Sequence, residues 1–271
     1  MKPVKLALAR HCIKYLIRAY GIKEIFVPYY LCRTVWKTVR EENCKVKFYH
    51  IKSDFMPALD FPKDAYIIYP NYFGLCSKNC QYLANIYPNL IIDNTQSFYS
   101  KPMGLASFNS LRKFFPVNSG AYLYTQNVID ENFEVFDSQT PYVSPQQNYS
   151  DFVHNELILD NEKNIKLISP KIEQIMVNYN FDEDKDKRLY FYKKYYEKYN
   201  LLNKIHIYPT GDDIPYCYPF CPKSSDAKES ILAKNLPLIR LWKDLPENFE
   251  ENKFINDVVA LPLNNYCELF V

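Results

Sequence analysis

The sequence LIIDNTQSF, at residues 90–98, joins a short apolar run to an acidic residue. Three apolar residues in a row, Leu90 to Ile92, are typical of a buried strand, and Asp93 stands where that strand would end. An acid at the carboxyl end of a buried parallel strand can bind a cation, a ribose or a protonated ring nitrogen. The alternative is a turn cap, because aspartate commonly begins turns. Taken alone, an aspartate in this position is more often a cap.

The segments around this stretch alternate between strand and helix patterns. The patterns predict strands at residues 24–27, 45–50, 65–69 and 121–125, and helices at residues 4–20, 34–42 and 77–87. Such alternation predicts an α/β fold with a mostly parallel sheet covered by helices. Ligands of such sheets bind at the carboxyl ends of the strands, which here are residues 28–32, 70–74 and 93–98.

The second half of the chain has a different pattern. After a loop at residues 126–147, it predicts helices at 170–179, 184–199 and 226–234, and strands at 204–208, 216–220 and 258–262. The strands are short and no longer alternate regularly with helices. We therefore predict a large domain at residues 1–180 and a small C-terminal α+β domain at residues 181–271.

The composition is that of a globular protein with little net charge. The chain has 271 residues, 48% of them hydrophobic, and a formal net charge of +2. A charge this small predicts no binding to nucleic acid or to a membrane surface. No run of about 18 apolar residues is present. Arg10, His11 and Lys14 interrupt the apolar stretch that a signal peptide needs, so we expect a cytoplasmic protein.

Cysteine and glycine bear on metal and nucleotide binding. The eight cysteines include the pairs Cys76/Cys80 and Cys217/Cys221, which could form a four-thiolate zinc site if the pairs met in space. In a long chain without a signal peptide, we expect buried free thiols and no metal. Only 5 glycines are present, and no glycine-rich nucleotide-binding motif occurs.

Lys113 lies 20 residues after Asp93 (113 − 93), between Leu111 and the apolar pair Phe114 and Phe115. A lysine amine held among apolar groups loses its proton more easily, which makes it a candidate nucleophile or Schiff-base residue. The alternative is a surface lysine whose stem covers apolar residues while the amine stays in water. Taken alone, the surface lysine is the more frequent case.

Together these segments resemble the DegT/DnrJ/StrS family of sugar aminotransferases, which are pyridoxal-phosphate enzymes of fold type I. The residues that carry the resemblance are Ala9-Arg10, Val27–Cys32, Pro70–Gly74, Ile92–Phe98 and Phe108–Ala121, with weaker matches at Pro237–Trp242 and Leu261–Leu263. The match at residues 93–120 is the most specific. With the resemblance in place, Asp93 and Lys113 are expected to be functional residues.

The resemblance implies a role for each matching residue. Lys113 would form the Schiff base with the cofactor and later transfer protons, and Asp93 would pair with the pyridinium nitrogen. Gln96 would lie near the phenolic oxygen of the ring, and Tyr30, of the Tyr29-Tyr30 pair, would pack on the ring face. The phosphate would be bound by Ser110 and by the backbone amides near Ala9 and Arg10.

The resemblance also implies a substrate and a partner. The substrate would be a keto-sugar nucleotide, the amino donor glutamate, and the assembly a homodimer. This sequence departs from the family in having Leu8-Ala9 where the family has Ser-Gly before the first-helix arginine. It is also shorter than most members. The alternative is therefore a non-catalytic scaffold that binds a sugar nucleotide or a protein. Some relatives with histidine in place of the lysine are dehydratases, and Lys113 favours the aminotransferase branch.

Overall fold

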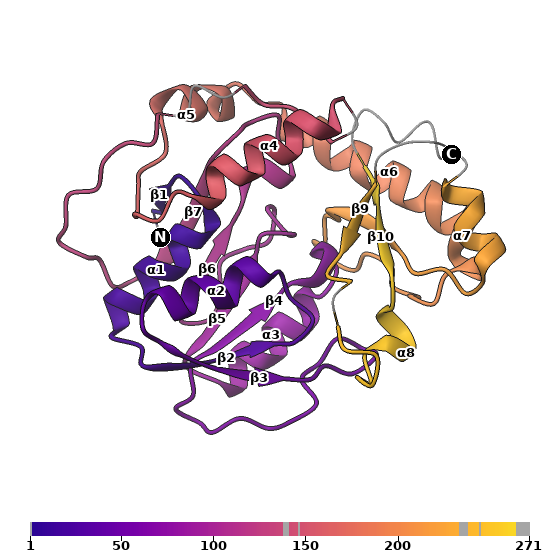
Figure 1. Cartoon of the computed structure of the whole chain (residues 1–271), viewed down its shortest axis with the longest axis horizontal. Coiled ribbons are helices and arrows are strands. Elements are labelled where there is room, and N and C mark those ends of the chain that lie inside the picture. Colours follow the sequence, from indigo (N-terminus) through magenta and orange to yellow (C-terminus); the bar gives the residue numbers. More distant parts are fainter. Residues whose placement is uncertain (1, 138–140, 146, 233–237, 244, 264–271) are drawn as a thin grey trace.

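The apolar run at residues 90–92 and Asp93 after it lie in β5 (Leu90–Asn94), the central strand of a seven-stranded sheet (Figure 1). The computed structural model describes residues 2–137, 141–145, 147–232, 238–243 and 245–263. The other strands of this sheet are β1 (Val4–Leu6), β2 (Glu24–Pro28), β3 (Lys45–Tyr49), β4 (Ile67–Pro70), β6 (Ala106–Asn109) and β7 (Ala121–Thr125). Their order is β1-β7-β6-β5-β4-β2-β3. Strands β2 to β6 are parallel, and the two others are antiparallel to their neighbours, so the predicted mostly parallel sheet is confirmed.

Helices cover both faces of this sheet because neighbouring strand residues point to opposite sides. On β5, Ile91 packs with α1 (Ala9–Tyr20) and α2 (Arg33–Glu41), whereas Ile92 packs with α3 (Ser77–Ile86). Both isoleucines are at most 1% exposed, and burying such a side chain contributes about 1.5–3 kcal/mol. Among the described helices, none combines the length and the apolar character that a membrane span requires.

Helix α1 follows from the spacing of its apolar residues. Cys12, Ile13, Leu16 and Ile17 recur at intervals of three and four, which places them on one buried face. The helix ends at Gly21, whose φ of 61° is the left-handed conformation that glycine adopts without strain. The Gly21 N–H donates to the Arg18 carbonyl and the Ile22 N–H to the Ile17 carbonyl, which satisfies the last turn.

His11 in the first turn of α1 makes the stability of the fold depend on pH. Its imidazole is fully buried; burial lowers the pKa of His11 to about 4, and Nδ1 accepts a hydrogen bond from the Lys166 N–H at 3.2 Å. The unfolded chain, with an ordinary histidine pKa of about 6.5, binds a proton first as the pH falls. The contribution is therefore complete above pH 6.5, and about 3 kcal/mol of unfolding free energy is lost as the pH falls to about 4.

This prediction can be measured by urea unfolding of the wild type and of His11→Asn, at pH 7 and at about pH 4.5. Asparagine keeps an acceptor for the Lys166 N–H but does not titrate. The wild type is expected to lose more unfolding free energy on acidification than the variant. Equal losses in the two proteins would contradict the assignment to His11.

The C-terminal part builds a second, smaller sheet. Its strands are β8 (Cys217–Phe220), β9 (Ile239–Leu241) and β10 (Val258–Pro262), in the antiparallel order β8-β10-β9. It lies beside the long helix α6 (Phe181–Tyr199), with α7 (Ser225–Leu232) and α8 (Asn252–Ile255) nearby (Figure 1). Tyr69 of the large sheet, Tyr192 of α6 and Leu261 of β10 belong to one hydrophobic cluster. The second sheet therefore shares its core with the first, and the division at residue 180 stays a prediction.

Several predicted elements differ from the structure. Residues 4–6 form strand β1, paired with β7, so the first helix begins at Ala9 and not at Val4. The strand predicted at 204–208 is wrong: this segment lies in irregular structure, where the Ile207 carbonyl accepts a hydrogen bond from the Tyr192 hydroxyl at 2.7 Å. Helices α4 (Tyr149–Asp160) and α5 (Pro170–Val177) precede α6, and α4 was not predicted. The predicted residues 233 and 234 of the last long helix lie outside the described residues.

Candidate active site

Asp93 and Lys113 come together at the carboxyl end of β5. Asp93 is near the end of that strand, and Lys113 ends the short 3-10 helix η2 (Leu111–Lys113), which follows the neighbouring parallel strand β6. Thr95 connects them: its N–H donates to Asp93 Oδ1 at 2.8 Å, and its Oγ1 accepts a hydrogen bond from Lys113 Nζ at 3.4 Å. Two residues 20 positions apart in the sequence thus form one polar site at the strand ends.

The Asp93 carboxylate is buried beside a cationic neighbour, Lys113. Asp93 is only 3% exposed, and this burial raises the pKa of its carboxyl above the ordinary value. The charge of Lys113 and the hydrogen bonds from Thr95 lower the same pKa, but by less than burial raises it. A buried carboxylate is stabilised only when it is paired. A reaction that consumes the charge of Lys113 would therefore leave Asp93 in need of another cation, such as a protonated ring nitrogen.

Gln96 presents a buried amide with one unsatisfied end. Its Oε1 accepts a hydrogen bond from the Phe73 N–H at 2.8 Å, whereas Nε2 has no partner among the described residues. Gly74, with a φ of +74°, follows Phe73 in the 3-10 turn η1 (Tyr72–Gly74). A Cβ at Gly74 would lie 2.6 Å from the Gln96 carbonyl oxygen and 2.7 Å from that of Ile214, so only glycine lets these backbones meet. The orphaned amide donor fits an oxygen acceptor on a ligand.

A cavity of about 740 Å³ lies against Lys113. This volume is in the range of sites for cofactors and small molecules. Ser110, 6% exposed, and Lys113 line one side, and α6, β9 and the end of β10 line the other. The charged residues of the described wall are Arg112, Lys113, Glu156, Glu183, Asp184, Lys187, Arg188 and Arg240. Five of these are basic and three acidic, so the cavity favours an anionic ligand.

Arg188 of α6 holds the two segments that flank the lysine. It is 2% exposed and donates from Nε to Asp184 Oδ2 at 2.7 Å. Its Nη2 donates to the Phe114 carbonyl at 3.0 Å, and its Nη1 to the Tyr216 carbonyl at 3.2 Å. Phe114 is the residue after Lys113, and Lys113 Nζ lies 5.8 Å from the centre of the Tyr216 ring. The buried guanidinium therefore fixes the backbone on both sides of the amine.

Tyr30 lies outside the wall that the described residues form around this cavity. It is fully buried, its ring stacks on Tyr72 at 5.9 Å between centroids, and the edge of Trp242 meets it at 4.8 Å. Cys32 lines the cavity from the same turn. The structure thus places Tyr30 in the core beside the site, because three large aromatic rings bury one another there. The packing of Tyr30 on the cofactor ring therefore stays a prediction.

The start of α1 is covered by the protein itself. Leu8, at the position before the helix, has no side-chain oxygen to cap it, and it packs in an apolar cluster of Ala7, Leu8, Phe136 and Leu159. Arg10 points to the end of α4, where it contacts Asp160 Oδ1 at 2.6 Å and the Leu159 carbonyl at 3.3 Å. Ala9 and Arg10 are not part of the described cavity wall. The phosphate anchor at Ala9 and Arg10 stays a prediction, and in this packing the Arg10 guanidinium is paired with Asp160.

The four cysteines of the two pairs are not gathered into one ligand group among the described residues. Cys76 and Cys80 lie at the start of α3, and Cys217 and Cys221 lie in and just after β8. All four are free and buried, and burial raises the pKa of each thiol above its ordinary value. Within the described residues, no group of three or more histidine, cysteine, aspartate or glutamate side chains could hold a metal ion.

These contacts test whether pyridoxal phosphate fits the site. The donors suit the ring half, because Lys113 offers an amine, Asp93 a buried carboxylate and Gln96 an unpaired amide donor at one set of strand ends. Lys113 lines the described cavity wall, whereas Asp93 and Gln96, like Tyr30, are buried outside it. At the start of α1, Leu8 and Ala9 offer no side-chain donor to a phosphate, and the Arg10 guanidinium is paired with Asp160. Ser110, which lines the cavity together with Lys113, offers a hydroxyl.

Comparison with known proteins places this geometry in context. No protein-family model and no curated protein matches the chain. Solved structures do. A DegT DnrJ EryC1 StrS aminotransferase from Brucella abortus has a TM-score of 0.61 and 14% identity, over 97% of this chain and 80% of its own. DesV from S. venezuelae, in complex with a ketimine intermediate, has a TM-score of 0.65 and 14% identity, over 99% and 82%.

The protein NtdA from Bacillus subtilis, with bound cofactor PMP, also matches, with a TM-score of 0.60 and 11% identity over 97% of this chain and 68% of its own. Identities this low report on the fold and not on the reaction. The strand order and the likeness to these solved structures show the same fold. The chain therefore has the fold of the DegT/DnrJ/EryC1/StrS sugar aminotransferases, as its motifs predicted.

Proposed function

We propose that the protein is a pyridoxal-phosphate-dependent aminotransferase that acts on a keto-sugar nucleotide, for the synthesis of a surface polysaccharide or another glycoside. One observation carries the proposal. Lys113 and the buried Asp93 share Thr95 at the strand ends, and the lysine faces a cavity of about 740 Å³. A scaffold protein has no need of a buried acid placed behind a lysine, because an isolated buried carboxylate costs stability.

Each site residue has a separate role in the proposed reaction. When bound, pyridoxal phosphate supplies an electron sink for the carbanion that forms at the substrate. Lys113 would supply the amine that attaches the cofactor, and its Nζ would afterwards hold the proton that leaves the substrate carbon. The Asp93 carboxylate would keep the ring nitrogen protonated. Gln96 Nε2, unpartnered among the described residues, would be a donor for a ring oxygen.

The charge of the cavity supports a nucleotide-sugar substrate. Lys187 of α6 and Arg240 of β9 also line the cavity, and such cations suit the phosphate groups of a nucleoside diphosphate. Arg240 is paired with Asp257 in the absence of a ligand. Glutamate is the proposed amino donor. We also propose a homodimer in which the partner chain completes the site, as the family resemblance implies.

A second candidate is a non-catalytic scaffold that binds a sugar nucleotide or a protein. The start of α1 favours it, because Leu8 and Ala9 offer no side-chain hydroxyl to a phosphate and the Arg10 guanidinium is paired with Asp160. The two candidates differ in one property: only the enzyme attaches the cofactor to Lys113.

The test is the visible absorbance band of lysine-bound pyridoxal phosphate. The wild type, incubated with the cofactor and desalted, is expected to keep the band, and Lys113→Ala to lack it. Amino transfer in the variant should fall by about 10²–10⁴-fold, the usual contribution of a positioned acid–base group. Lys45→Ala is the control. Lys45 is on β3, is paired with Glu24 of β2 and lies outside the described cavity wall, so this variant should behave as the wild type. A wild type without the band would exclude the aminotransferase mechanism and leave the scaffold.

A further inference from the structure

Thr95 stands between the buried carboxylate of Asp93 and the amine of Lys113. Its backbone N–H donates to Asp93 Oδ1 at 2.8 Å, and its Oγ1 accepts a hydrogen bond from Lys113 Nζ at 3.4 Å. The Thr95 hydroxyl also forms a hydrogen bond with the Asp93 carboxyl, which lowers the pKa of that carboxyl. Asn94 and Gln96, its neighbours in the chain, are buried, whereas Thr95 is partly exposed. The Thr95 side chain therefore links a buried acid to an amine that lines the cavity.

A hydroxyl suits this place because it donates and accepts at the same time. An ionised Asp93 only accepts hydrogen bonds, and a protonated Lys113 only donates them. The single hydrogen on Thr95 Oγ1 is therefore directed at the carboxylate, which leaves the oxygen lone pairs for the ammonium group. Both bonds involve an ionised partner, and such bonds are roughly twice as strong as bonds between neutral groups. Because threonine is branched at Cβ, few χ1 rotamers are open to it, and the direction of its hydroxyl is restricted.

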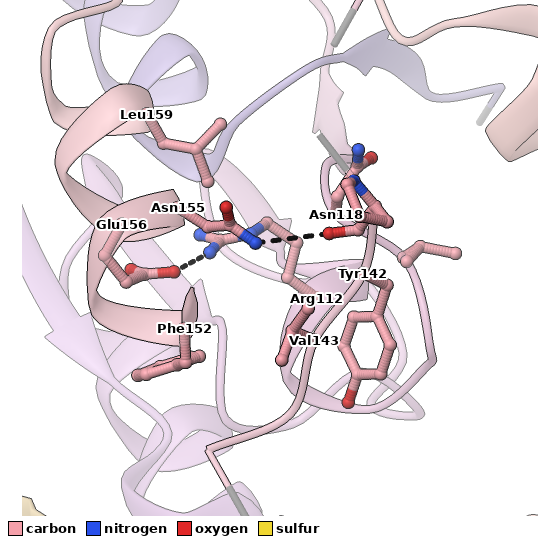
Figure 2. Close-up of a pocket in the computed structure, with 10 residues that line it drawn as sticks. Arg112, Asn118, Tyr142, Val143, Phe152, Asn155, Glu156 and Leu159 are labelled. Atoms are coloured by element: carbon pink, nitrogen blue, oxygen red, sulfur yellow. Dashed lines mark hydrogen bonds and ion pairs between the residues drawn. The ribbon is translucent and has the colours of Figure 1, made fainter. Parts of the chain in front are cut away.

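The segment that carries Lys113 is fixed by its neighbours, but the amine itself is not. Figure 2 shows the side chain of Arg112, the preceding residue of η2, between α4 and the loop that carries Tyr142, and Arg112 pairs there with Glu156. The lysine amine, by contrast, ends a flexible four-carbon stem. Among the described residues, the hydrogen-bond partner of Lys113 Nζ is Thr95. The direction of the amine therefore depends on the Thr95 hydroxyl.

We propose that Thr95 is a positioning residue of the candidate active site, whose hydroxyl fixes the Lys113 amine at the strand ends and couples it to Asp93. The inference deepens the proposed function and rests on it only for the carbonyl compound with which the amine reacts. Thr95 acts through Lys113 and Asp93. Its effect on the reaction can be large, because a misplacement of about 1 Å at a reacting atom can lower a rate by about 10²-fold.

The first test needs no cofactor and follows the titration of Asp93 by carbon-13 NMR of labelled aspartate, with Asp93→Asn used to identify the signal. Burial raises the pKa of Asp93, and the hydrogen bonds from Thr95 lower it. Thr95→Val keeps the branched shape and the backbone N–H of threonine but removes the hydroxyl. The pKa of Asp93 is therefore expected to rise in Thr95→Val and to return toward the wild-type value in Thr95→Ser, which restores a hydroxyl.

The second test asks whether the hydroxyl holds the amine near the carboxylate, again without cofactor. The charge of Lys113 lowers the pKa of Asp93, so Lys113→Met is expected to raise it. If Thr95 holds the amine, the rise caused by Lys113→Met should be smaller in the Thr95→Val background than in the wild-type background. An equal rise in the two backgrounds would show that the amine keeps its place without Thr95, and the proposal would be wrong.

Thr125→Val is the matched control, because it also removes a buried threonine hydroxyl. Thr125 Oγ1 lies 2.9 Å from the Tyr20 hydroxyl, and Thr125 pairs with Ala106 at the start of β6, the opposite end of that strand from the site. This variant should lose stability without any change in the titration of Asp93. If Thr95→Val does not fold, Thr95→Ala removes the same hydroxyl with a smaller side chain.

The third test is the rate at which the lysine-bound band appears after pyridoxal phosphate is added. Thr95→Val is expected to slow it by about tenfold to a hundredfold, the loss expected for one hydrogen bond to a charged group, and Thr95→Ser to stay within about threefold of the wild type. If both titration tests give the expected result but no protein forms the band, the aminotransferase proposal fails and the role of Thr95 stands. If Thr95→Val leaves the pKa of Asp93 unchanged, or forms the band at the wild-type rate, the hydroxyl has no positioning role.

Discussion

Replacing Asp93 with asparagine is expected to lower the rate of amino transfer by about 10²–10³-fold, the usual effect of removing one preorganised electrostatic group. The same change is expected to leave the protein at least as stable as the wild type. Asparagine has the shape of aspartate and still accepts the Thr95 N–H bond that Asp93 Oδ1 accepts at 2.8 Å. It has no charge, however, and cannot keep a ring nitrogen protonated.

The expected stability of Asp93→Asn follows from the direction in which folding shifts the pKa of Asp93. Burial raises the pKa of this carboxyl in the folded protein above its ordinary value. The unfolded chain therefore releases the Asp93 proton at a lower pH than the folded chain does, and the free energy of unfolding falls as the pH rises through this interval. At neutral pH Asp93 therefore lowers the free energy of unfolding relative to asparagine, which does not titrate. Below the ordinary aspartate pKa both proteins carry a neutral group, and the difference should vanish.

Urea unfolding at neutral and acidic pH, together with the rate of amino transfer, measures both halves. Asp64→Asn, which changes an exposed aspartate of a loop, is the matched control and should alter neither quantity. An Asp93→Asn protein that is markedly less stable than the wild type at neutral pH would show that Asp93 is a structural partner of Lys113. A stable variant with full activity would show that no ring nitrogen depends on this carboxylate.

The parts of the structure that sequence could predict are those with local patterns. The apolar run before Asp93 and the periodicity of α1 predicted elements that the structure contains, because each buries one face against the sheet. The prediction that Asp93 and Lys113 act together came from the order of motifs, and Thr95, directly after β5, forms a hydrogen bond with each of them. By contrast, α4 has almost no separation of apolar and polar faces, with Leu159 as its buried residue, so its pattern did not predict a helix.

The parts that sequence could not predict depend on contacts between distant segments. Whether Tyr30 or Cys32 faces the cavity is decided by Trp242, which packs on Tyr30 from the second sheet. The covered start of α1 depends on Leu159, about 150 residues away in the chain, against Leu8. Arg188 had a local signal that was available: it shares the buried face of α6 with Phe191, Tyr192 and Tyr195, at spacings of three, four and seven. A charged residue in an apolar stripe indicates a buried ion pair.

Arg188→Met is expected to lower the free energy of unfolding by about 3–5 kcal/mol, the usual cost of breaking a buried ion pair by removing one partner. Methionine is unbranched and apolar, so it can fill much of the space of the arginine stem. It leaves Asp184 buried with a side chain that is 9% exposed, where Tyr99 still donates to Oδ2 at 2.6 Å but the neutralising guanidinium is gone. It also leaves the carbonyls of Phe114 and Tyr216 without their donor.

Urea unfolding at neutral pH measures this loss, and Lys185→Met is the matched control on the same helix. Lys185 pairs with Asp182 three residues earlier, at a surface where such pairs contribute about 0–1 kcal/mol, so its loss should be small. The double variant Arg188→Met/Asp184→Asn should recover part of the stability, because it removes the uncompensated charge. A loss below about 1 kcal/mol in Arg188→Met would mean that water replaces the guanidinium.

Variants of Arg188 can also show whether this residue positions Lys113 or only stabilises the fold. Because it binds the Phe114 carbonyl next to Lys113 and the Tyr216 carbonyl opposite it, its loss should loosen both neighbours of the amine. The double variant is therefore expected to regain stability without regaining the cofactor affinity of the wild type, since the Asp184→Asn change restores no donor to either carbonyl. If affinity returned together with stability, Arg188 would matter only for the fold. If affinity stayed low in a stable protein, α6 would set the position of the lysine that defines the reaction.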